Sequence, residues 1–301
     1  QEIDELLKII KDLAKEGRSI IFITHKLNEI QRVADRCTIL RKGKYIGTVK
    51  VGSVSNEELS EMMVGRKVML QVKKDEPKLG DVALKVDDLV VKAEGISSLN
   101  KVHHVSFEVR KGEIVAIAGV ENNGQSELVQ AITGLRPVDS GKILLNDIDI
   151  TKWSIRDRNF GFISHIPEDR HKYGLILSFS LSNNFILQTY FSEQYSSKGF
   201  LDFKEINSRS EDLIKQYDIR TAQGPSTIVK NMSGGNQQKA ILAREMDRKH
   251  ELLVAVQPTR GLDVGAIEYI HEQLIRERDK GQAILMISLE LEEVLSVSDR
   301  I

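Results

Sequence analysis

The chain has few features that would cross-link it or hold it in a membrane. Cys37 is the only cysteine among 301 residues, so no disulfide can form within the chain and a reducing compartment is expected. No apolar run approaches the roughly 20 residues that a membrane-spanning helix needs, so contact with a membrane would require a partner. The net charge is −1, with 43 basic and 44 acidic residues, which argues against electrostatic binding to nucleic acid.

The sequence does contain an internal repeat. Residues 1–37 align without a gap with residues 265–301, and both segments show a helix, an apolar strand and a second helix. The residues of the first segment that recur identically in the second are Ile3, Gly17, Ile20, Ile23, Leu27, Glu29, Val33, Asp35 and Arg36. We interpret the chain as the end of one domain copy followed by most of a second copy. Because Gln1 opens inside a helical pattern and Ile301 follows one, we expect an excerpt from a longer protein.

Local patterns predict the elements of the first copy. An apolar stripe with spacings of three and four predicts a helix over residues 3–13, which Gly17 ends. Ser19 to Thr24 is predicted to be a buried strand, and Thr38 to Val51 a hairpin. A short helix is predicted from Ser55 to Met63, with Ser55 as N-cap and Glu58 completing a capping box. The expected domains are 1–65, a charged linker at 66–82, and a second copy at 83–301 that lacks its C-terminal strands.

Strands alternate with helices in the second copy, which favours a mainly parallel sheet in an α/β domain. The predicted strands are 84–91, 105–109, 113–118, 142–145, 162–166, 252–256 and 283–288. The predicted helices are 125–134, 203–217, 235–248 and 264–279.

A glycine-bounded loop follows the strand that begins at Glu113. Its two glycines, Gly119 and Gly124, have the spacing of a phosphate-binding loop, but Gln125 stands where lysine is expected. The backbone N–H groups of such a loop can cradle phosphate at a helix N-terminus. Ser126 could still ligate Mg²⁺. An ordinary strand-to-helix turn remains the alternative explanation of this segment.

The segment Asn231-Met-Ser233-Gly-Gly-Asn-Gln-Gln-Lys239 opens a helix and resembles the signature motif of the ATP-binding-cassette (ABC) transporter family. The strings GVENNGQSEL, HIPEDRHKYGL and QPTRGLDVGAIEYIH look most like the nucleoside-import branch of its tandem-cassette importers. The resemblance implies an α/β P-loop NTPase fold with a parallel-sheet core. An antiparallel β-subdomain at about 83–112 and a helical insertion at about 170–235 would complete it.

The same resemblance identifies departures from an active site. An active cassette would have Asp at position 256 and Glu at position 257, where this sequence has Val256 and Gln257. Leu289 stands at the position of the switch histidine, and Glu168 lies near the usual Q-loop glutamine. Together these changes remove the metal, base and charge functions of phosphoryl transfer. We therefore expect the second copy to be catalytically degenerate.

The resemblance also assigns residues to the ligands ATP and Mg²⁺. His25 of the first copy is expected to be a catalytic switch residue. The expected cofactor-binding residues are Gly119, Asn123, Gly124, Gln125, Ser126, Glu127, Ser233, Gly234, Gly235, Asn236 and Asp263, with Ser126 also the metal ligand. The signature of copy two would serve a site whose phosphate loop lies in the rest of the first cassette.

The implied function is coupling of ATP hydrolysis to import of a nucleoside or simple sugar. Transmembrane permease subunits would be the direct partners, an extracytoplasmic solute-binding protein an indirect one, and the protein would lie at the cytoplasmic face of the membrane. Nucleic acid is not an expected partner. Two alternatives remain: a soluble tandem cassette acting on ribosomes or nucleic acid, and a regulatory nucleotide-binding module.

Overall fold

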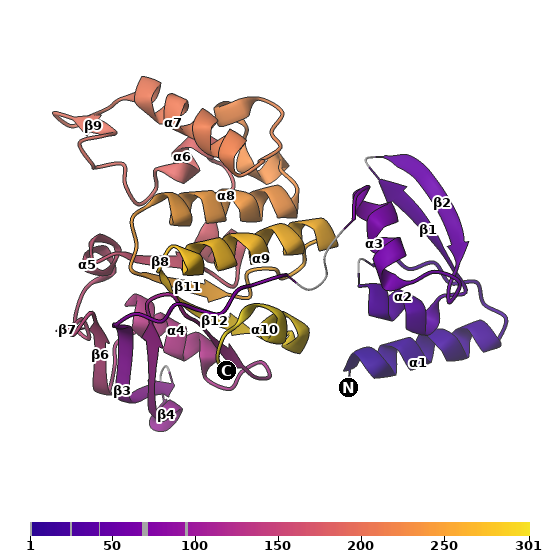
Figure 1. Ribbon diagram of the computed structural model, residues 1–301, viewed down its shortest axis with the longest axis horizontal. Helices are drawn as coiled ribbons and strands as arrows, with labels where there is room; N and C mark the ends of the chain where they lie inside the picture. Colours follow the sequence, from indigo (N-terminus) through magenta and orange to yellow (C-terminus); the bar gives the residue numbers. More distant parts are fainter. Residues whose placement is uncertain (1, 25, 42, 68–71, 94–95) are drawn as a thin grey trace. The chain divides into compact units, whose positions relative to one another are not determined.

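The structure, a computed structural model, describes residues 2–24, 26–41, 43–67, 72–93 and 96–301 (Figure 1). The chain divides into two compact units. The first unit is Gln1–Val72 with Leu262–Tyr269, and the second is Lys73–Gly261 with Ile270–Ile301. None of the described helices combines the length and the apolar character that crossing a membrane requires.

The first unit is a small α/β unit. Its elements are α1 Glu2–Lys15, α2 Leu27–Val33, β1 Arg36–Arg41, β2 Lys44–Lys50 and α3 Asn56–Val64. The strands pair antiparallel, which confirms the predicted hairpin, although Lys42 of its turn lies outside the described residues. The capping box of α3 is confirmed, because Ser55 accepts the N–H of Glu58 and Glu58 accepts that of Ser55. Leu27, Ile39 and Leu59 lie in its core.

The strand predicted from Ser19 to Thr24 is wrong. Residues 18–24 have no regular secondary structure, and the side chains of Ile21 and Ile23 are 95% and 98% exposed. A strand needs a neighbour that accepts and donates backbone hydrogen bonds. Among the described strands, β1 and β2 pair only with each other, so no neighbour is available to this segment.

The matching segment of the second repeat does form a strand. β12, Ala283–Ser288, pairs in parallel with β5, Ile114–Ala118, on one side and with β11, Leu252–Val256, on the other. All of its residues are buried. The presence of neighbouring strands therefore decides whether this repeated segment forms a strand.

The helix ends of the two repeats are nevertheless alike. Gly17 follows α1 and Gly281 follows α9, Val264–Asp279, with φ of +87° and +90°. The next residue in each case donates its N–H to a carbonyl in the last turn, that of Leu13 or of Glu277, at 3.2 Å in both. A left-handed glycine closes each helix in the same way.

A second local contact recurs in both copies. The hydroxyl of Thr24 donates to Glu29 at 2.8 Å, and the hydroxyl of Ser288 donates to Glu293 at 2.5 Å. In each copy the same hydroxyl also accepts a backbone N–H two residues on, at 3.1 Å. This contact lies at the start of α2 and of α10, Leu291–Val297. The repeat is thus visible in the structure as well as in the sequence.

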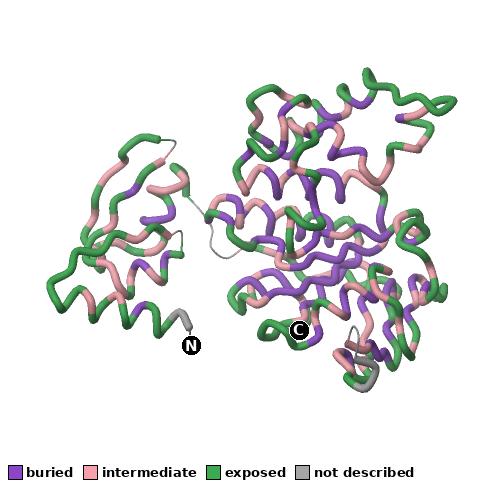
Figure 2. Tube along the Cα trace, turned by 180° about the vertical axis from the view of Figure 1, so that it is seen from behind, coloured by how far each residue is buried: buried purple, intermediate pink, exposed green. Residues whose placement is uncertain are grey.

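The second unit is built on a four-stranded parallel sheet in the order β5-β12-β11-β8, with β8 at Ile163–Ile166. Helices lie on both sides of this sheet (Figure 1). The strands form the buried centre of the unit (Figure 2). The predicted parallel core is confirmed.

An antiparallel sheet packs beside the core, in the order β4-β3-β6-β7. Its strands are β3 Val82–Ala93, β4 Ile96–Arg110, β6 Ser140–Leu145 and β7 Ile148–Asp149. The predicted β-subdomain at about 83–112 is too short. The strand β6 pairs with β3, although the helix α4, Gln125–Thr133, lies between them in the sequence. Local patterning could not reveal that long-range pairing.

The helical insertion follows β8. It contains a π-helical turn at Arg170–Gly174, α6 at Leu181–Phe185, α7 at Phe203–Gln216 and α8 at Gly234–Asp247. Short elements complete this insertion: β9 at Ser196–Ser197, β10 at Phe200–Leu201, and 3₁₀ turns at Gly224–Ser226 and Val229–Asn231. The short helix α5, Ile155–Phe160, precedes β8.

Candidate functional site

The loop between β5 and α4 is filled by one of its own side chains. The carboxamide of Gln125 folds back, and its Nε2 donates to the carbonyl of Val120 at 2.9 Å. Its Oε1 accepts the backbone N–H of Asn123 at 3.0 Å. A Cβ built on Gly119 would lie 2.5 Å from the same Nε2, so the carboxamide sits against the floor of the loop. In a phosphate-binding loop such N–H groups receive phosphate oxygens. Here the N–H of Asn123 already has a partner.

Gly124 gives the loop its tight turn into α4. Its φ is +93°, a left-handed conformation that strains other residues. A Cβ at this position would lie 2.2 Å from the carbonyl oxygen of Lys101. Gly124 therefore makes the turn between the loop and α4 possible. Glu127 lies half-buried in the first turn of the same helix.

A carboxylate joins this loop to the segment that follows β11. Glu168 Oε2 accepts from the Ser126 hydroxyl at 3.4 Å. Glu168 Oε1 accepts from Gln257 Nε2 at 3.0 Å and from Arg260 Nη1 at 2.9 Å. Arg260 also lies 3.8 Å from Glu121 of the loop. The charges of this region are therefore paired with one another.

The positions that the sequence predicts to be degenerate lie at the ends of β11 and β12. Val256 ends β11 and is 4% exposed. Gln257 follows it with φ of +44°, and its N–H donates to the carbonyl of Ile287 at 2.7 Å. A left-handed conformation at a residue other than glycine is typical of strained functional positions. Leu289 directly follows β12.

The surroundings of Ser126 fit a Mg²⁺ ion poorly. Mg²⁺ prefers carboxylate and phosphate oxygens around an octahedron. The carboxylate bonded to Ser126 is Glu168, which is already paired with Arg260, and Val256 offers no oxygen on its side chain. Within the part of the chain that the structure describes, no cluster of three or more His, Cys, Asp and Glu residues could hold a metal. Metal ligation by Ser126 stays a prediction.

The N-terminus of α8, by contrast, is open. Ser233 is its N-cap and is exposed, and its side chain makes no capping bond to the helix. The hydroxyl instead accepts from Asn236 Nδ2 at 2.9 Å. Without a capping bond, the first-turn N–H groups have no side-chain partner from the cap residue. Gly234 and Gly235 add no side chains of their own at this end, which suits an anion.

Asp263 and His25 are two further predicted site residues. Asp263 precedes α9 and accepts the N–H of Ala266 at 2.9 Å, so its side chain caps that helix. His25 lies outside the described residues. The roles predicted for both stay predictions.

Sequence reasoning did not name Arg170 or Arg260 as site residues. Both stand inside motifs that were recognised, the HIPEDR and QPTRGLD strings. Arg170 Nη1 donates to the carbonyl of Arg260 at 3.1 Å, which links the two segments. The signal that could have revealed them was a basic side chain within each motif.

A buried carboxylate network supports the end of β12. Glu293 Oε1 accepts from Thr259 at 2.7 Å and from His271 Nε2 at 3.1 Å, and its Oε2 accepts from Ser288 at 2.5 Å. Burial raises the pKa of Glu293, but the hydrogen bonds from His271, Ser288 and Thr259 outweigh burial and hold the pKa below its ordinary value. The network ties α10 to the segments that follow β11 and β12.

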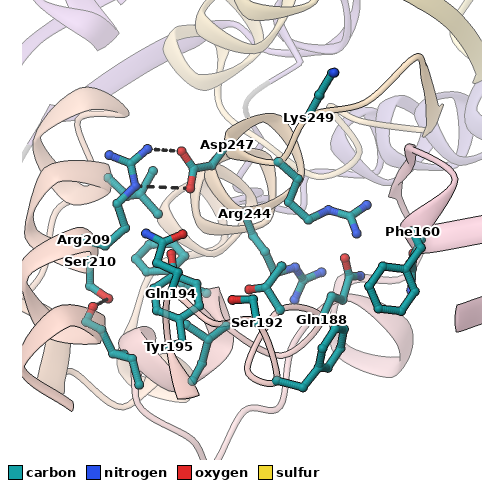
Figure 3. A pocket seen from close by; sticks show the side chains of 18 of the residues that line it. Phe160, Gln188, Ser192, Gln194, Tyr195, Arg209, Ser210, Arg244, Asp247 and Lys249 are labelled. Atoms are coloured by element: carbon teal, nitrogen blue, oxygen red, sulfur yellow. Dashed lines mark hydrogen bonds and ion pairs between the residues drawn. The ribbon is translucent and has the colours of Figure 1, made fainter. Parts of the chain in front are cut away.

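A hollow of about 330 Å³ is lined by the helical insertion and by residues at the end of α5. Figure 3 shows it between α7 and the end of α8, with the ion pair of Arg209 and Asp247 at one side. Phe160 lies at its other side, with its ring 5.1 Å from that of Phe191 between centroids. The guanidinium of Arg156 lies 4.6 Å from the Phe191 ring centroid. This hollow is a feature separate from the glycine loop.

Comparisons with known proteins identify the family. A sequence profile described as "ABC transporter" matches residues 102–260. The chain is 53% identical over 300 residues to the nucleoside import ATP-binding protein NupA of Lactococcus lactis, covering all of this chain and 59% of the relative. It is 49% identical over 301 residues to the guanosine import ATP-binding protein NupO of Bacillus subtilis, covering all of this chain and 58% of the relative. The chain thus spans somewhat more than half the length of these relatives.

A ribose import relative and two solved structures complete the comparison. The ribose import ATP-binding protein RbsA of Clostridium tetani is 41% identical over 300 residues, covering all of this chain and 58% of the relative. A nucleotide-free cassette from an ABC transporter superposes with a TM-score of 0.60 at 19% identity, over 72% of this chain and 85% of that one. A dimeric cassette bound to ADP and Pi superposes with a TM-score of 0.58 at 17% identity, over 70% and 89%. These likenesses confirm the expected cassette fold, and the chain belongs to the ABC transporter family.

Proposed function

We propose that this chain is part of the ATP-binding subunit of an importer that couples ATP hydrolysis to uptake of a small polar solute. The observation that carries the proposal is a contrast within one cassette. The signature helix has an open N-terminus, whereas the glycine loop is filled by Gln125. A cassette with an open signature helix but no free phosphate loop can complete the ATP site of a partner cassette, while its own site does not hydrolyse ATP.

The active site would be a composite of two cassettes. Ser233, Gly234, Gly235 and Asn236 would face the γ-phosphate of an ATP molecule whose phosphate loop belongs to the rest of the first cassette. ATP and Mg²⁺ are assigned to that site. His25, from the first copy, would donate a hydrogen bond to the same phosphate. Asp263 would lie near the junction of the cassettes.

The second copy's own loop is proposed not to hydrolyse ATP. The carboxamide of Gln125 bonds to the backbone of the loop in which a phosphate would otherwise bind, and the carboxylate of Glu168 is paired with Arg260. Val256 and Gln257 supply neither a metal ligand nor a base. Support for this assignment comes from four positions in three separate segments of the chain: Gln125, Val256, Gln257 and Leu289. Drift at a single position would not explain it.

The transported solute is proposed to be a nucleoside. Relatives named for nucleoside or guanosine import are 53% and 49% identical to this chain, against 41% for the ribose import relative. The proposed direct partners are transmembrane permease subunits, which would contact the helical insertion from the cytoplasmic side of the membrane. An extracytoplasmic solute-binding protein would deliver the solute. These names also disfavour an action on ribosomes or nucleic acid.

A pair of substitutions in the full-length protein tests the composite site. Ser233→Arg should abolish ATP hydrolysis, because a bulky cation would fill the open end of α8. Gln125→Ala should change turnover little, because its loop lacks the lysine, metal ligand and base. Loss of one transition-state donor costs about a hundredfold or more in rate, so the contrast is measurable in steady-state assays. Equal damage from both changes would contradict the assignment of roles.

The solute is tested separately. The binding protein of the intact system should bind nucleosides, as measured by calorimetry with guanosine and ribose. A binding protein that takes ribose tightly and ignores nucleosides would overturn the choice of solute, while leaving the composite site untouched.

A further inference from the structure

Arg170 lies against the open N-terminus of the signature helix. A Cβ built on Gly234, the first residue of α8, would lie 3.0 Å from Arg170 Nη2 and 3.4 Å from its Cζ. The other terminal nitrogen, Nη1, donates to the carbonyl of Arg260 at 3.1 Å. The guanidinium is therefore anchored on one side and packed on the helix end on the other. Glycine at position 234 makes this approach possible.

The carboxylates next to Arg170 in the sequence are engaged elsewhere. Asp169 Oδ1 accepts the N–H groups of His171 and Lys172 at 2.9 and 3.0 Å, and so caps the π-helical turn. Glu168 is paired with Arg260 at 2.9 Å. Arg170 Nε is buried and has no hydrogen-bond partner among the described residues. The charge of Arg170 is therefore not neutralised by its sequence neighbours.

This arrangement brings a guanidinium close to a helix N-terminus. A helix N-terminus carries a partial positive charge, so a guanidinium placed there is repelled. An anion bound beside both groups would be attracted by the guanidinium and by the helix end. A guanidinium presents several N–H donors in a planar fork that matches phosphate oxygens, and such charge-assisted bonds are about twice as strong as neutral ones. The position of Arg170 thus points to a phosphate ligand, as does the uncapped N-terminus at Ser233.

We propose that Arg170 is a phosphate-binding residue that acts together with the Ser233 motif on the γ-phosphate of the nucleotide held by the first cassette. The inference rests on the proposed function, because that nucleotide is bound across the junction of two cassettes. Arg170 would supply in trans a positive charge that the signature motif itself lacks. It would therefore discriminate ATP from ADP, which has no γ-phosphate.

The test compares two ligands on the full-length protein. Binding of a non-hydrolysable ATP analogue and of ADP is measured for the wild type, Arg170→Gln and Arg170→Lys. Arg170→Gln should weaken binding of the analogue about tenfold or more and leave ADP binding within about twofold. Arg170→Lys keeps the charge but loses the planar fork, so it should retain part of the preference for the analogue. Lys172→Gln is the matched control, because this exposed lysine lies over the Tyr173 ring, 4.9 Å from its centroid.

The possible outcomes separate two kinds of failure. Equal weakening of both ligands, or of neither, by Arg170→Gln overturns the inference and leaves Arg170 as a brace to the carbonyl of Arg260. Ser233→Arg in the same assay tests the composite site. If Ser233→Arg leaves binding of the analogue unchanged, the proposed function itself fails. If Arg170→Gln does not fold, the binding measurements on Arg170→Lys test the inference instead. A residue that only holds the carbonyl of Arg260 in place should show no preference between the two ligands, whereas a phosphate-binding cation should still bind the analogue more tightly than ADP.

Discussion

Residues 1–37 and 265–301 present one sequence pattern in two surroundings. Both segments end their first helix with a left-handed glycine, and both join a hydroxyl to a glutamate at the start of the second helix. Only the second segment forms a strand, because only there do β5 and β11 lie on either side. In the first, Ile21 and Ile23 are almost fully exposed. Helices and their caps depend on nearby residues, whereas a strand depends on distant ones.

The largest difference is expected for one substitution made in both copies. Ile23 and Ile287 occupy equivalent positions and are 98% and 2% exposed. Ile287→Ala should lower the free energy of unfolding by about 2–5 kcal/mol, because it leaves a cavity in the sheet. Ile23→Ala should change it by less than about 0.5 kcal/mol. Fluorescence of Trp153, the only tryptophan, reports unfolding of the second unit, and hydrogen exchange of α2 reports the first.

The comparison becomes sharper in the full-length protein. If the rest of the first cassette supplies neighbours for residues 19–24, Ile23→Ala should become as destabilising as Ile287→Ala. A small effect of Ile23→Ala in that protein would contradict the equivalence of the two copies.

A second matched pair is Glu293→Gln and Glu29→Gln. Glu293 is buried and accepts from Thr259, His271 and Ser288, whereas half-buried Glu29 accepts from Thr24. Removing the buried charge should cost about 3 kcal/mol, and the matched change under about 1 kcal/mol. Urea unfolding and local hydrogen exchange measure both. Equal costs would mean that the hydroxyl contact, rather than the buried network, carries the stability.

Acid should weaken the second unit through His165. Burial lowers the pKa of His165 to about 4, and its Nε2 is buried without a partner among the described residues. Between pH about 6.5 and about 4 the unfolded chain binds the proton and the folded chain does not, so the free energy of unfolding falls as pH falls. The loss is up to about 3 kcal/mol.

The control for this titration is His165→Gln, which should flatten the pH dependence of the Trp153 unfolding midpoint over that range. An unchanged slope would assign the acid sensitivity to other groups. In the first unit the lowered carboxyl pKa is that of Asp4, which pairs with Arg32, and Asp4 is exposed.

The smallest effect should be the same in both copies. Gly17 and Gly281 have φ near +90°, and a Cβ on either would meet nothing within 4 Å. Gly17→Ala and Gly281→Ala should therefore each cost about 1 kcal/mol, through backbone strain alone. Hydrogen exchange at the ends of α1 and α9 measures both. A clear difference between the two would show that tertiary contacts reach even these helix ends.

The candidate site was partly predictable from the sequence. The motif spacing placed Gln125 at the start of the helix α4, and Val256 and Gln257 at the end of β11, as the structure has them. The motif spacing did not reveal that the Gln125 carboxamide turns back onto Val120 and Asn123, because a side-chain rotamer depends on the surrounding atoms. The approach of Arg170 to Gly234 was likewise invisible, since the two residues lie far apart in the chain.

The sequence by itself determined the local structure of this protein: the apolar stripes of the helices, the capping box at Ser55, the glycine stops and the motif loops. These features arise from hydrogen bonds and dihedral preferences within a few residues, which a linear pattern contains. Only the tertiary structure decided whether residues 18–24 or 283–288 became a strand, and that β6 joined β3. Backbone groups of a strand must find partners in distant segments, and a linear pattern does not say which segments will be there.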